Sequence, residues 1–369
     1  MAGTAALEDI IGIAPLTEAL RATTSGIPDP FPPEFSVVKP SNRVLGDQAK
    51  YTRINGARTT APLAAYGAPG RRVPLQPVSQ VPFRMLYTSM EININANMLN
   101  KLQAFEQYVQ DEGLDWLAYQ ISEVAKRMVN TRIVAKASML RYGAIYWDAP
   151  GNILPSASGA AFTFPANVPA NNQNQLNGII AAPWPLANTD ILGQIRKLKQ
   201  QSAQDTGLRP EHAMYGLNIP LYFQTNATLQ AYLARNANWR DTLVDTGDVP
   251  AGFAGIKRWT NVSHAFFEDQ NGTNQLLWDD DLVVFTPEMN QPDKMDWWGM
   301  YEGSAAVLNG FDAYADPLGA MKNLKQEYGQ SGYSVPVLTA PLGWTSFFQD
   351  VFLGAFKNEK AVYQADTTF

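Results

Sequence analysis

Apolar residues recur at three- and four-residue spacing over residues 114–142, which is the strongest periodic pattern in the chain. Leu117, Ile121 and Val124 fall on one side of a helical projection of this stretch. The pattern predicts a long amphipathic helix over 114–142. A shorter helix is predicted before it, capped by Asn95 or Asn97, running through Val109 and ended or kinked by Gly113.

Three other stretches have helical character. A short apolar pattern predicts a helix within 7–20. Asn188-Thr189-Asp190 is typical of a helix start, and the helix that follows is predicted to end near Gly207. A buried strand and turn are predicted over 208–223, followed by a helix to about Arg235.

Strand and turn patterns fill most of the rest of the chain: residues 43–90, 144–185, 250–288 and 328–344. Asn55-Gly56 and Asn271-Gly272 are dipeptides typical of tight hairpin turns. An isolated two-stranded hairpin is marginal in water. We therefore expect the first hairpin to lie across a neighbouring surface.

A proline-rich strip at 27–33 interrupts the N-terminal region. Proline lacks a backbone donor and restricts the residue before it, so this strip is predicted to be an extended arm. Phe31 and Phe35 are apolar groups that such an arm cannot bury alone. They are therefore candidate contacts with another subunit.

Composition narrows the class of protein. The 369 residues include 46% hydrophobic residues, enough for a sizeable core, but only 17% charged residues, against about 25% in a typical soluble domain. With no cysteine, disulfides, thiolate chemistry and the usual zinc sites are excluded. The net charge of −6 disfavours a protein that grips nucleic acid through its phosphates. The N-terminus lacks the features of a secretion signal, and no stretch predicts a membrane helix.

Charge is divided unevenly along the chain. Residues 35–90 carry eight basic side chains and one acid, whereas residues 265–316 carry eleven acids and one base. The basic residues could grip nucleic acid or simply face solvent; we favour a third interpretation, in which they contact the acidic segment of an adjoining copy. The candidate interface residues are Arg53, Arg58, Arg71, Arg72, Asp279, Asp280 and Asp281, together with Phe31 and Phe35.

Catalytic and cofactor patterns are weak. His212, in a turn leading into a strand, and His264, in a strand, have no partner at metal-ligand spacing, so structural or surface positions are favoured for both. The acids at 279–281 would point to alternate faces of a strand and would not converge on one cation. No phosphate-binding loop or nucleophile elbow is present. No catalytic residue, cofactor or metal is predicted.

The order of elements, and four segments in particular, resemble the major capsid proteins of tailed bacteriophages, specifically the lambda-type capsid protein E family with the Hong Kong 97-type fold. The segments are residues 51–70 (YTRINGARTTAPLAAYGAPG), 141–155 (RYGAIYWDAPGNILP), 185–222 (PLANTDILGQIRKLKQQSAQDTGLRPEHAMYGLNIPLY) and 328–344 (YGQSGYSVPVLTAPLGW).

The resemblance implies an α+β fold divided as follows: N-terminal arm 1–42, E-loop 43–90, P-domain with its spine helix 91–185, A-domain 186–325, a return to the P-domain sheet at 326–350 and a C-terminal tail at 351–369. It also implies a non-enzymatic subunit whose hexamers and pentamers form an icosahedral head around double-stranded DNA. The implied partners are other copies of the chain, a portal, a scaffold or protease and a decoration protein, with assembly in the bacterial cytoplasm and no membrane.

Two alternatives remain open from the sequence. The nine tryptophans and the Asn-rich loops would also suit a hydrolase or a carbohydrate-binding protein. A cellular nanocompartment shell would use the same fold as a capsid.

Overall fold

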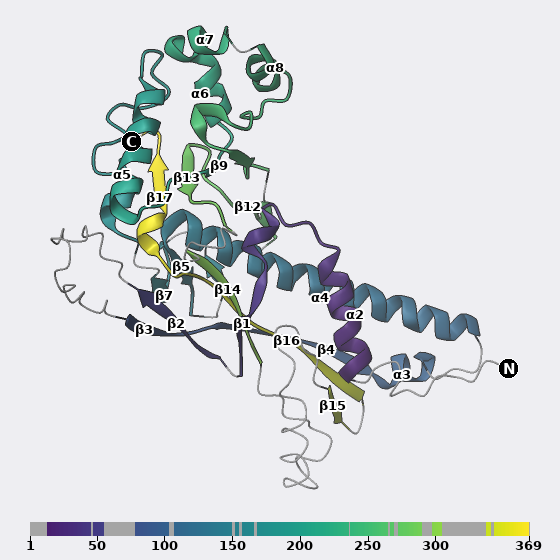
Figure 1. The fold of residues 1–369 in the computed structure, drawn as a ribbon. Coiled ribbons are helices and arrows are strands. Elements are labelled where there is room, and N and C mark those ends of the chain that lie inside the picture. The colour runs from purple at the N-terminus through teal and green to yellow at the C-terminus, as the bar shows by residue number, and fades with distance from the viewer. Residues whose placement is uncertain are drawn as a thin grey trace, which may run out of the picture.

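The structure is a computed structural model. It describes residues 13–45, 47–54, 78–102, 107–149, 152–154, 157–165, 168–235, 237–264, 266–268, 272–289, 297–304, 337–340 and 343–368. Helices and strands are both well represented, which confirms the α+β class (Figure 1).

An elongated unit, here called the α4 unit, forms the lower part of the molecule in Figure 1. Its sheet has the order β1-β14-β16-β15, with β4 on the other side of β16; β1 runs parallel to β14 and the remaining pairs are antiparallel. The helices and strands of this unit are α2 (Ile13–Ser25), α3 (Ala96–Leu102), α4 (Gln107–Tyr142), β1 (Val38–Leu45), β4 (Leu86–Asn95), β14 (Trp298–Ser304), β15 (Val337–Ala340) and β16 (Gly343–Phe356).

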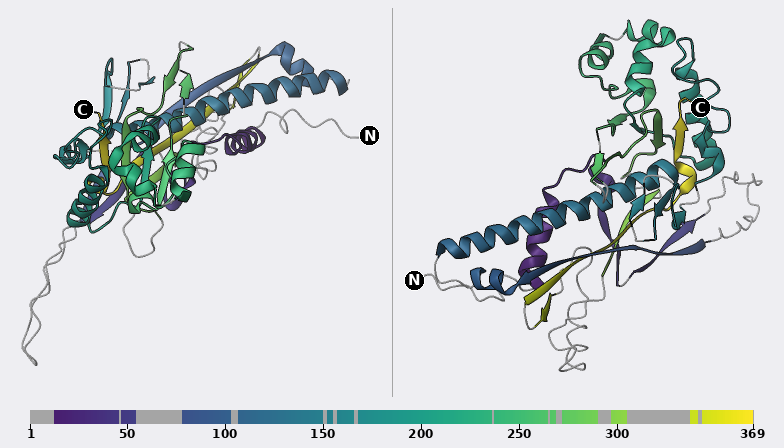
Figure 2. Two further views of the ribbon diagram at one scale, coloured as in Figure 1. Left: turned by 90° about the horizontal axis from the view of Figure 1, so that it is seen from above. Right: turned by 180° about the vertical axis from the view of Figure 1, so that it is seen from behind.

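The 36-residue helix α4 lies along β4 and β16, as the two views of Figure 2 show. Its C-terminal half packs into the main core, and its N-terminal half forms a second core with α2 and β4. The long amphipathic helix is therefore confirmed.

The boundary predicted at Gly113 is wrong, because α4 continues through this residue. Glycine inside a helix costs only about 1 kcal/mol relative to alanine, which packing can offset. Here a Cβ on Gly113 would lie 3.2 Å from Cδ2 of Leu102. The glycine thus allows α3 to approach α4 closely.

A second unit, here called the β13 unit, forms the upper part of Figure 1. Its five-stranded sheet has the order β10-β9-β13-β17-β8, in which β9 and β13 are antiparallel. Its helices and strands are α5 (Ile191–Thr206), α6 (Ile219–Thr225), α7 (Ala227–Leu233), α8 (Ala237–Asp245), β8 (Gln173–Asn174), β9 (His212–Tyr215), β10 (Arg258–Asn261), β13 (Leu282–Thr286) and β17 (Tyr363–Asp366).

Helix α5 confirms the prediction made for it. The side chain of Asp190 accepts a hydrogen bond from the Gly193 amide at 2.9 Å, and Gly207 ends the helix in the left-handed conformation. These are the two local signals that the sequence showed.

The C-terminal tail predicted at 351–369 is wrong. Strand β16 continues to Phe356, and β17 then pairs with both β13 and β8 inside the second sheet. Tyr363, Gln364 and Ala365 are all buried. A strand that is buried on both faces lacks the alternation of apolar and polar residues that marks a half-buried strand. The four residues of β17 therefore gave no strand signal in the sequence.

Small elements complete the described fold. They are the hairpin of β11 (Phe266–Glu268) and β12 (Asn274–Leu276), the sheet of β5 (Ala144–Trp147), β6 (Ile153–Leu154) and β7 (Phe162–Pro165), the ribbon of β2 (Gln48–Ile54) and β3 (Val78–Arg84), and single 3₁₀ turns at Pro33–Phe35 (η1), Ala170–Asn172 (η2), Phe253–Gly255 (η3) and Glu359–Ala361 (η4). The β11–β12 pairing confirms a hairpin at this place, with Glu268 opposite Asn274, whereas Asn271 and the Asn55-Gly56 dipeptide lie outside the described residues.

Candidate assembly surfaces

The β2–β3 ribbon forms no ladder with a third strand among the described residues. Its two strands pair antiparallel over seven positions, from Gln48 opposite Arg84 to Ile54 opposite Val78. Buried Ala49 and the ring of Phe83, whose centroid lies 4.9 Å from that of Tyr301 on β14, anchor the base. The ribbon extends toward the lower left of Figure 1.

The basic candidates belong to this ribbon region. Arg53 lies on β2 opposite Ser79, while Arg58, Arg71 and Arg72 lie outside the described residues. Lys50 and Arg84, on the two described strands, are exposed. The contact predicted between these basic side chains and an acidic segment of another copy therefore stays a prediction.

The acidic candidates contact groups of their own chain. Asp279 forms a bidentate ion pair with Arg141, at the C-terminal end of α4. Asp281 accepts hydrogen bonds from Nδ2 of Asn218, at 2.9 Å, and from the hydroxyl of Tyr222. Burial and the two neighbouring carboxylates raise the pKa of Asp280.

The backbone of the turn at residues 279–281 also forms hydrogen bonds within the chain. The Asp280 carbonyl accepts from the Asn218 amide at 3.0 Å, and the Asp281 carbonyl accepts from the Thr367 amide at 3.1 Å. The turn therefore joins the β13 unit to α4 and to the C-terminal strand. Asp279 and Asp281 thus already have partners within the chain, and the interface role expected for the three acids stays a prediction.

Phe31 and Phe35 are buried in the core of their own chain, with exposed fractions of 3% and 1%. The Phe31 ring contacts Trp278, and the Phe35 ring contacts Trp297 and Trp298. Three tryptophans distant in sequence thus provide the surface that a proline-rich strip lacks. The reason given for placing these two rings at an interface is therefore wrong.

The predicted N-terminal arm is also anchored before the proline strip. The described helix, Ile13–Ser25, overlaps the predicted 7–20, of which residues 7–12 lie outside the described part; its Leu16 and Leu20 are buried against α4. After the strip, β1 joins the large sheet beside β14. Residues 13–45 therefore pack on their own chain.

An ion pair that sequence reasoning missed holds the arm on α4. The ammonium of Lys136 is almost completely buried and pairs with the Asp29 carboxylate; it also lies 2.7 Å from Oγ of Ser36. Burial lowers the pKa of Lys136, and the Asp29 charge opposes that effect.

A second missed group lies one helical turn earlier. The Arg132 guanidinium donates to the fully buried Asp350 at 2.7 Å and to Glu302 at 3.0 Å. Burial raises the pKa of Asp350 although Arg132 stabilises its charged form. The available signal was two cations, Arg132 and Lys136, four residues apart in an apolar stretch of helix, because such cations need acidic partners.

The two histidines differ in their surroundings. His212, the first residue of β9, is buried with Nε2 2.8 Å from Oγ1 of Thr260, and burial lowers its pKa to about 4. The structural role predicted for it fits this position. His264 is exposed in a turn, not in the predicted strand.

In the part of the chain that the structure describes, no three or more His, Asp or Glu side chains are grouped as a metal ion would require. No helix of these ranges combines the length and apolar character needed to span a membrane.

Comparison with known proteins gives a clear sequence match. Residues 36–295 match the family model described as phage major capsid protein E. No curated protein sequence matches the chain.

Solved structures give a fold match at low sequence identity. A phage-related protein from Bordetella bronchiseptica RB50 superposes with a TM-score of 0.54 at 12% identity, over 95% of this chain and 96% of that one. A structure from Gordonia phage Cozz gives 0.46 at 9% identity over 99% and 96% of the two chains. A virus-like particle from Pyrococcus furiosus gives 0.41 at 9% identity over 95% and 97%.

Proposed function

The chain belongs to the phage major capsid protein E family, and from this premise we propose that its copies form the hexamers and pentamers of an icosahedral head around double-stranded DNA. It is a capsid shell protein with the Hong Kong 97-type fold. The sequence therefore identified the family and the fold correctly. Its family is structural, so the hydrolase alternative has no support from the comparisons, and the nanocompartment alternative is not favoured.

The observation that carries the proposal is the β2–β3 ribbon. A two-stranded ribbon is marginal in water without further packing, and the described side chains that anchor it to the body of its own chain, Ala49 and Phe83, lie at its base. Lying across an adjacent copy would provide the missing contacts. The ribbon of each copy would lie on one neighbour, and the ribbon of another neighbour would lie on it. Many individually weak contacts would then act together.

We propose the following domain assignment. The α4 unit corresponds to the P-domain and the β13 unit to the A-domain, with the ribbon at 48–84 as the E-loop. Two of the boundaries expected from the sequence shift in this scheme. Strand β4 belongs to the P-domain sheet because it pairs with β16 over ten residues, and β14 belongs there too, although the sequence placed it within 186–325.

Further partners remain part of the proposal. A portal, a scaffold or protease and a decoration protein are expected from the family, with assembly in the host cytoplasm. The net charge of −6 fits a container that encloses DNA without gripping its phosphates tightly.

The test is assembly of the purified chain, followed by sedimentation and electron microscopy. Rings, shells or tubes are expected. A variant in which residues 51–81 are replaced by Asn-Gly keeps the base of the ribbon, because Lys50 and Pro82 face each other in the ladder. It should lose assembly while its melting temperature stays unchanged. A wild-type chain that remains monomeric at high concentration would overturn the proposal.

A further inference from the structure

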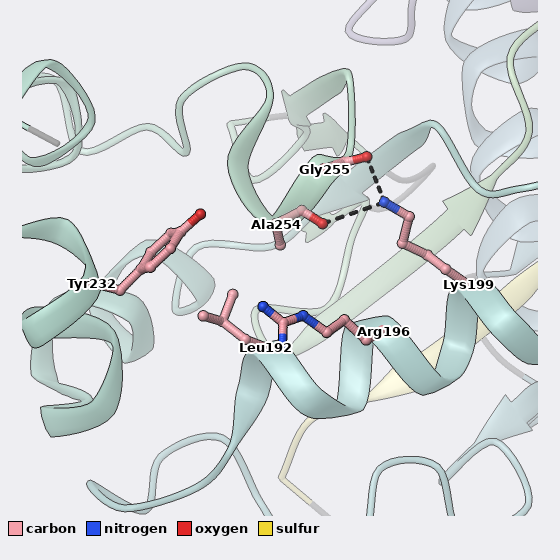
Figure 3. A pocket seen from close by; sticks show the side chains of 6 residues that line it. All are labelled: Leu192, Arg196, Lys199, Tyr232, Ala254 and Gly255. Atoms are coloured by element: carbon pink, nitrogen blue, oxygen red, sulfur yellow. Dashed lines mark hydrogen bonds between the residues drawn. The ribbon is translucent and has the colours of Figure 1, made fainter. Parts of the chain in front are cut away.

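A pocket of about 340 Å³ opens on the β13 unit between α5, α7 and the turn at η3 (Figure 3). It is lined by Leu192, Arg196, Lys199, Tyr232, Ala254 and Gly255. Figure 3 shows the Arg196 side chain extending from α5 toward Tyr232, while Lys199 turns to the opposite wall. There the Lys199 ammonium donates to the carbonyls of Gly255 at 2.7 Å and Ala254 at 3.4 Å.

The pocket has an excess of positive charge. None of its six lining residues is acidic. Arg196 is exposed and forms no ion pair or hydrogen bond within the described ranges. Burial lowers the pKa of Lys199, and the nearby Arg209 lowers it further. A guanidinium, an ammonium and a phenol around one cavity form a site for an oxyanion such as a carboxylate.

A carboxylate of the required kind lies on α8. Asp245, the last residue of α8, is exposed and has no partner in the part of the chain that the structure describes. A negative charge at a helix C-terminus is unfavourable, because the carbonyl ends of the helix dipoles are negative. The last turn of α8 holds no basic residue that would compensate for it. Val244, beside it, is 64% exposed.

The positions of these two groups suit an interface between copies. Helices α5 and α8 lie apart in Figure 1, and α8 packs through Trp239 on the outer side of the pocket wall that Tyr232 forms, with the two ring centroids 5.9 Å apart. A contact between two different faces of the same subunit is heterologous, and repetition of such contacts closes a ring when the rotation fits.

We propose that the α5 pocket receives the Asp245 carboxylate of an adjacent copy, with Val244 of that copy packed against Leu192. Arg196 then forms the principal ion pair, and Lys199 and Tyr232 supply further donors. This inference rests on the proposed function, because it assumes that copies of the chain assemble side by side. It names the contact that fixes the register between neighbouring A-domains.

Charge reversal tests the contact. Arg196→Glu and Asp245→Arg, made separately, should each raise the protein concentration needed for assembly by about tenfold, because each places like charges together. The double variant, in which the pair is reversed, should return to within about threefold of the wild type. Lys197→Glu is the matched control, since Lys197 is exposed on the same helix but does not line the pocket. Circular dichroism melting of each unassembled variant should match the wild type.

The outcomes separate the two proposals. If wild type and both single variants assemble equally well, the pocket is not an interface, although the shell function stands. If the single variants fail and the double variant also fails, Asp245 is not the occupant. If the wild type itself does not assemble, the proposed function falls and this inference with it.

Discussion

Lys136 and Arg132 lie one turn apart on α4, and each joins segments that are distant in sequence. Lys136 binds Asp29, 107 residues away, whereas Arg132 binds Asp350 on β16 and Glu302 on β14. A charge buried without a partner is costly, so removing one member of such a pair destabilises the fold more than a surface pair would. These ion pairs therefore specify where the arm and the two strands are placed on the helix.

The Lys136–Asp29 pair gives an asymmetric prediction. Asp29→Asn leaves a buried ammonium without a counter-charge, and we expect a loss of about 3 kcal/mol in the free energy of unfolding. Lys136→Met should cost less, because Asp29 is partly exposed and still accepts from the Phe31 amide and from Ser36. Urea unfolding of the unassembled chain measures both.

Asp241→Asn is the control for this pair, because Asp241 and Arg240 are exposed. It should change the free energy of unfolding by less than about 1 kcal/mol. Equal losses from Asp29→Asn and Asp241→Asn would show that the arm is not held on α4 in the free subunit.

His212 predicts a pH dependence of stability. Its pKa is about 4 in the folded chain, below the ordinary value of 6.5, mainly because of burial and also because of Arg258. Between these two pH values the unfolded chain binds the proton and the folded chain does not. Stability should therefore fall as the pH drops from about 6.5 to 4, by about 3 kcal/mol in total from this group.

The comparison of His212→Gln with the exposed His264→Gln isolates this contribution, since all other groups titrate alike. His212→Gln should flatten the stability profile between pH 6.5 and 4, whereas His264→Gln should leave it unchanged. The same slope in both variants would contradict a buried neutral imidazole.

At the scale of elements, α2 links the arm to the body of the chain. Leu16 and Leu20 are buried against α4, in the core that also contains Leu117 and Ile121. The arm is thus held by an apolar helix face in addition to the Lys136 ion pair.

Leu20→Ala should loosen this contact. A buried leucine cut to alanine costs about 2–5 kcal/mol, but a terminal helix can detach without global unfolding. We therefore expect faster amide hydrogen exchange in residues 13–25 and little change elsewhere. Glu18→Ala, at an exposed position of the same helix, is the control. Unchanged exchange in Leu20→Ala would show that α2 does not pack on its own α4 in solution.

Strand β16 depends on a close approach at Gly354. A Cβ at this position would lie 2.3 Å from the Trp298 indole, which donates a hydrogen bond to the Phe35 carbonyl at 3.1 Å. Gly354→Ala should therefore displace the indole and cost about 1–3 kcal/mol in thermal unfolding experiments. Full stability in this variant would mean that the ring can move without loss of packing.

Local signals explain which elements the sequence could predict. Helix α5 has its Asp190 cap, apolar spacing and Gly207 end within one stretch of chain, so its bounds followed directly. The placement of β17 depends on strands far away in sequence, and Gly113 depends on Leu102, so neither was predictable from local pattern. The partners of Phe31, Asp279 and Lys136 are also distant in sequence, so they could not be predicted from local pattern either.

At the scale of the whole molecule, the subunit consists of two packed units, an anchored arm and a two-stranded ribbon. The arm and the acidic turn at 279–281 hold the subunit together from within. In the proposed assembly, the ribbon and the α5 pocket with Asp245 make the contacts between copies. Apolar burial should supply most of the affinity, because exposed ion pairs contribute only about 0–1 kcal/mol each.

The most direct measurement is a cryo-electron microscopy map of the assembled particle at a resolution that traces the chain. The account predicts a closed shell in which β2 and β3 of each subunit lie on an adjacent copy, while residues 13–45 stay on their own α4. A particle in which every ribbon folds back on its own body, or a chain that stays solitary under all assembly conditions, would contradict it.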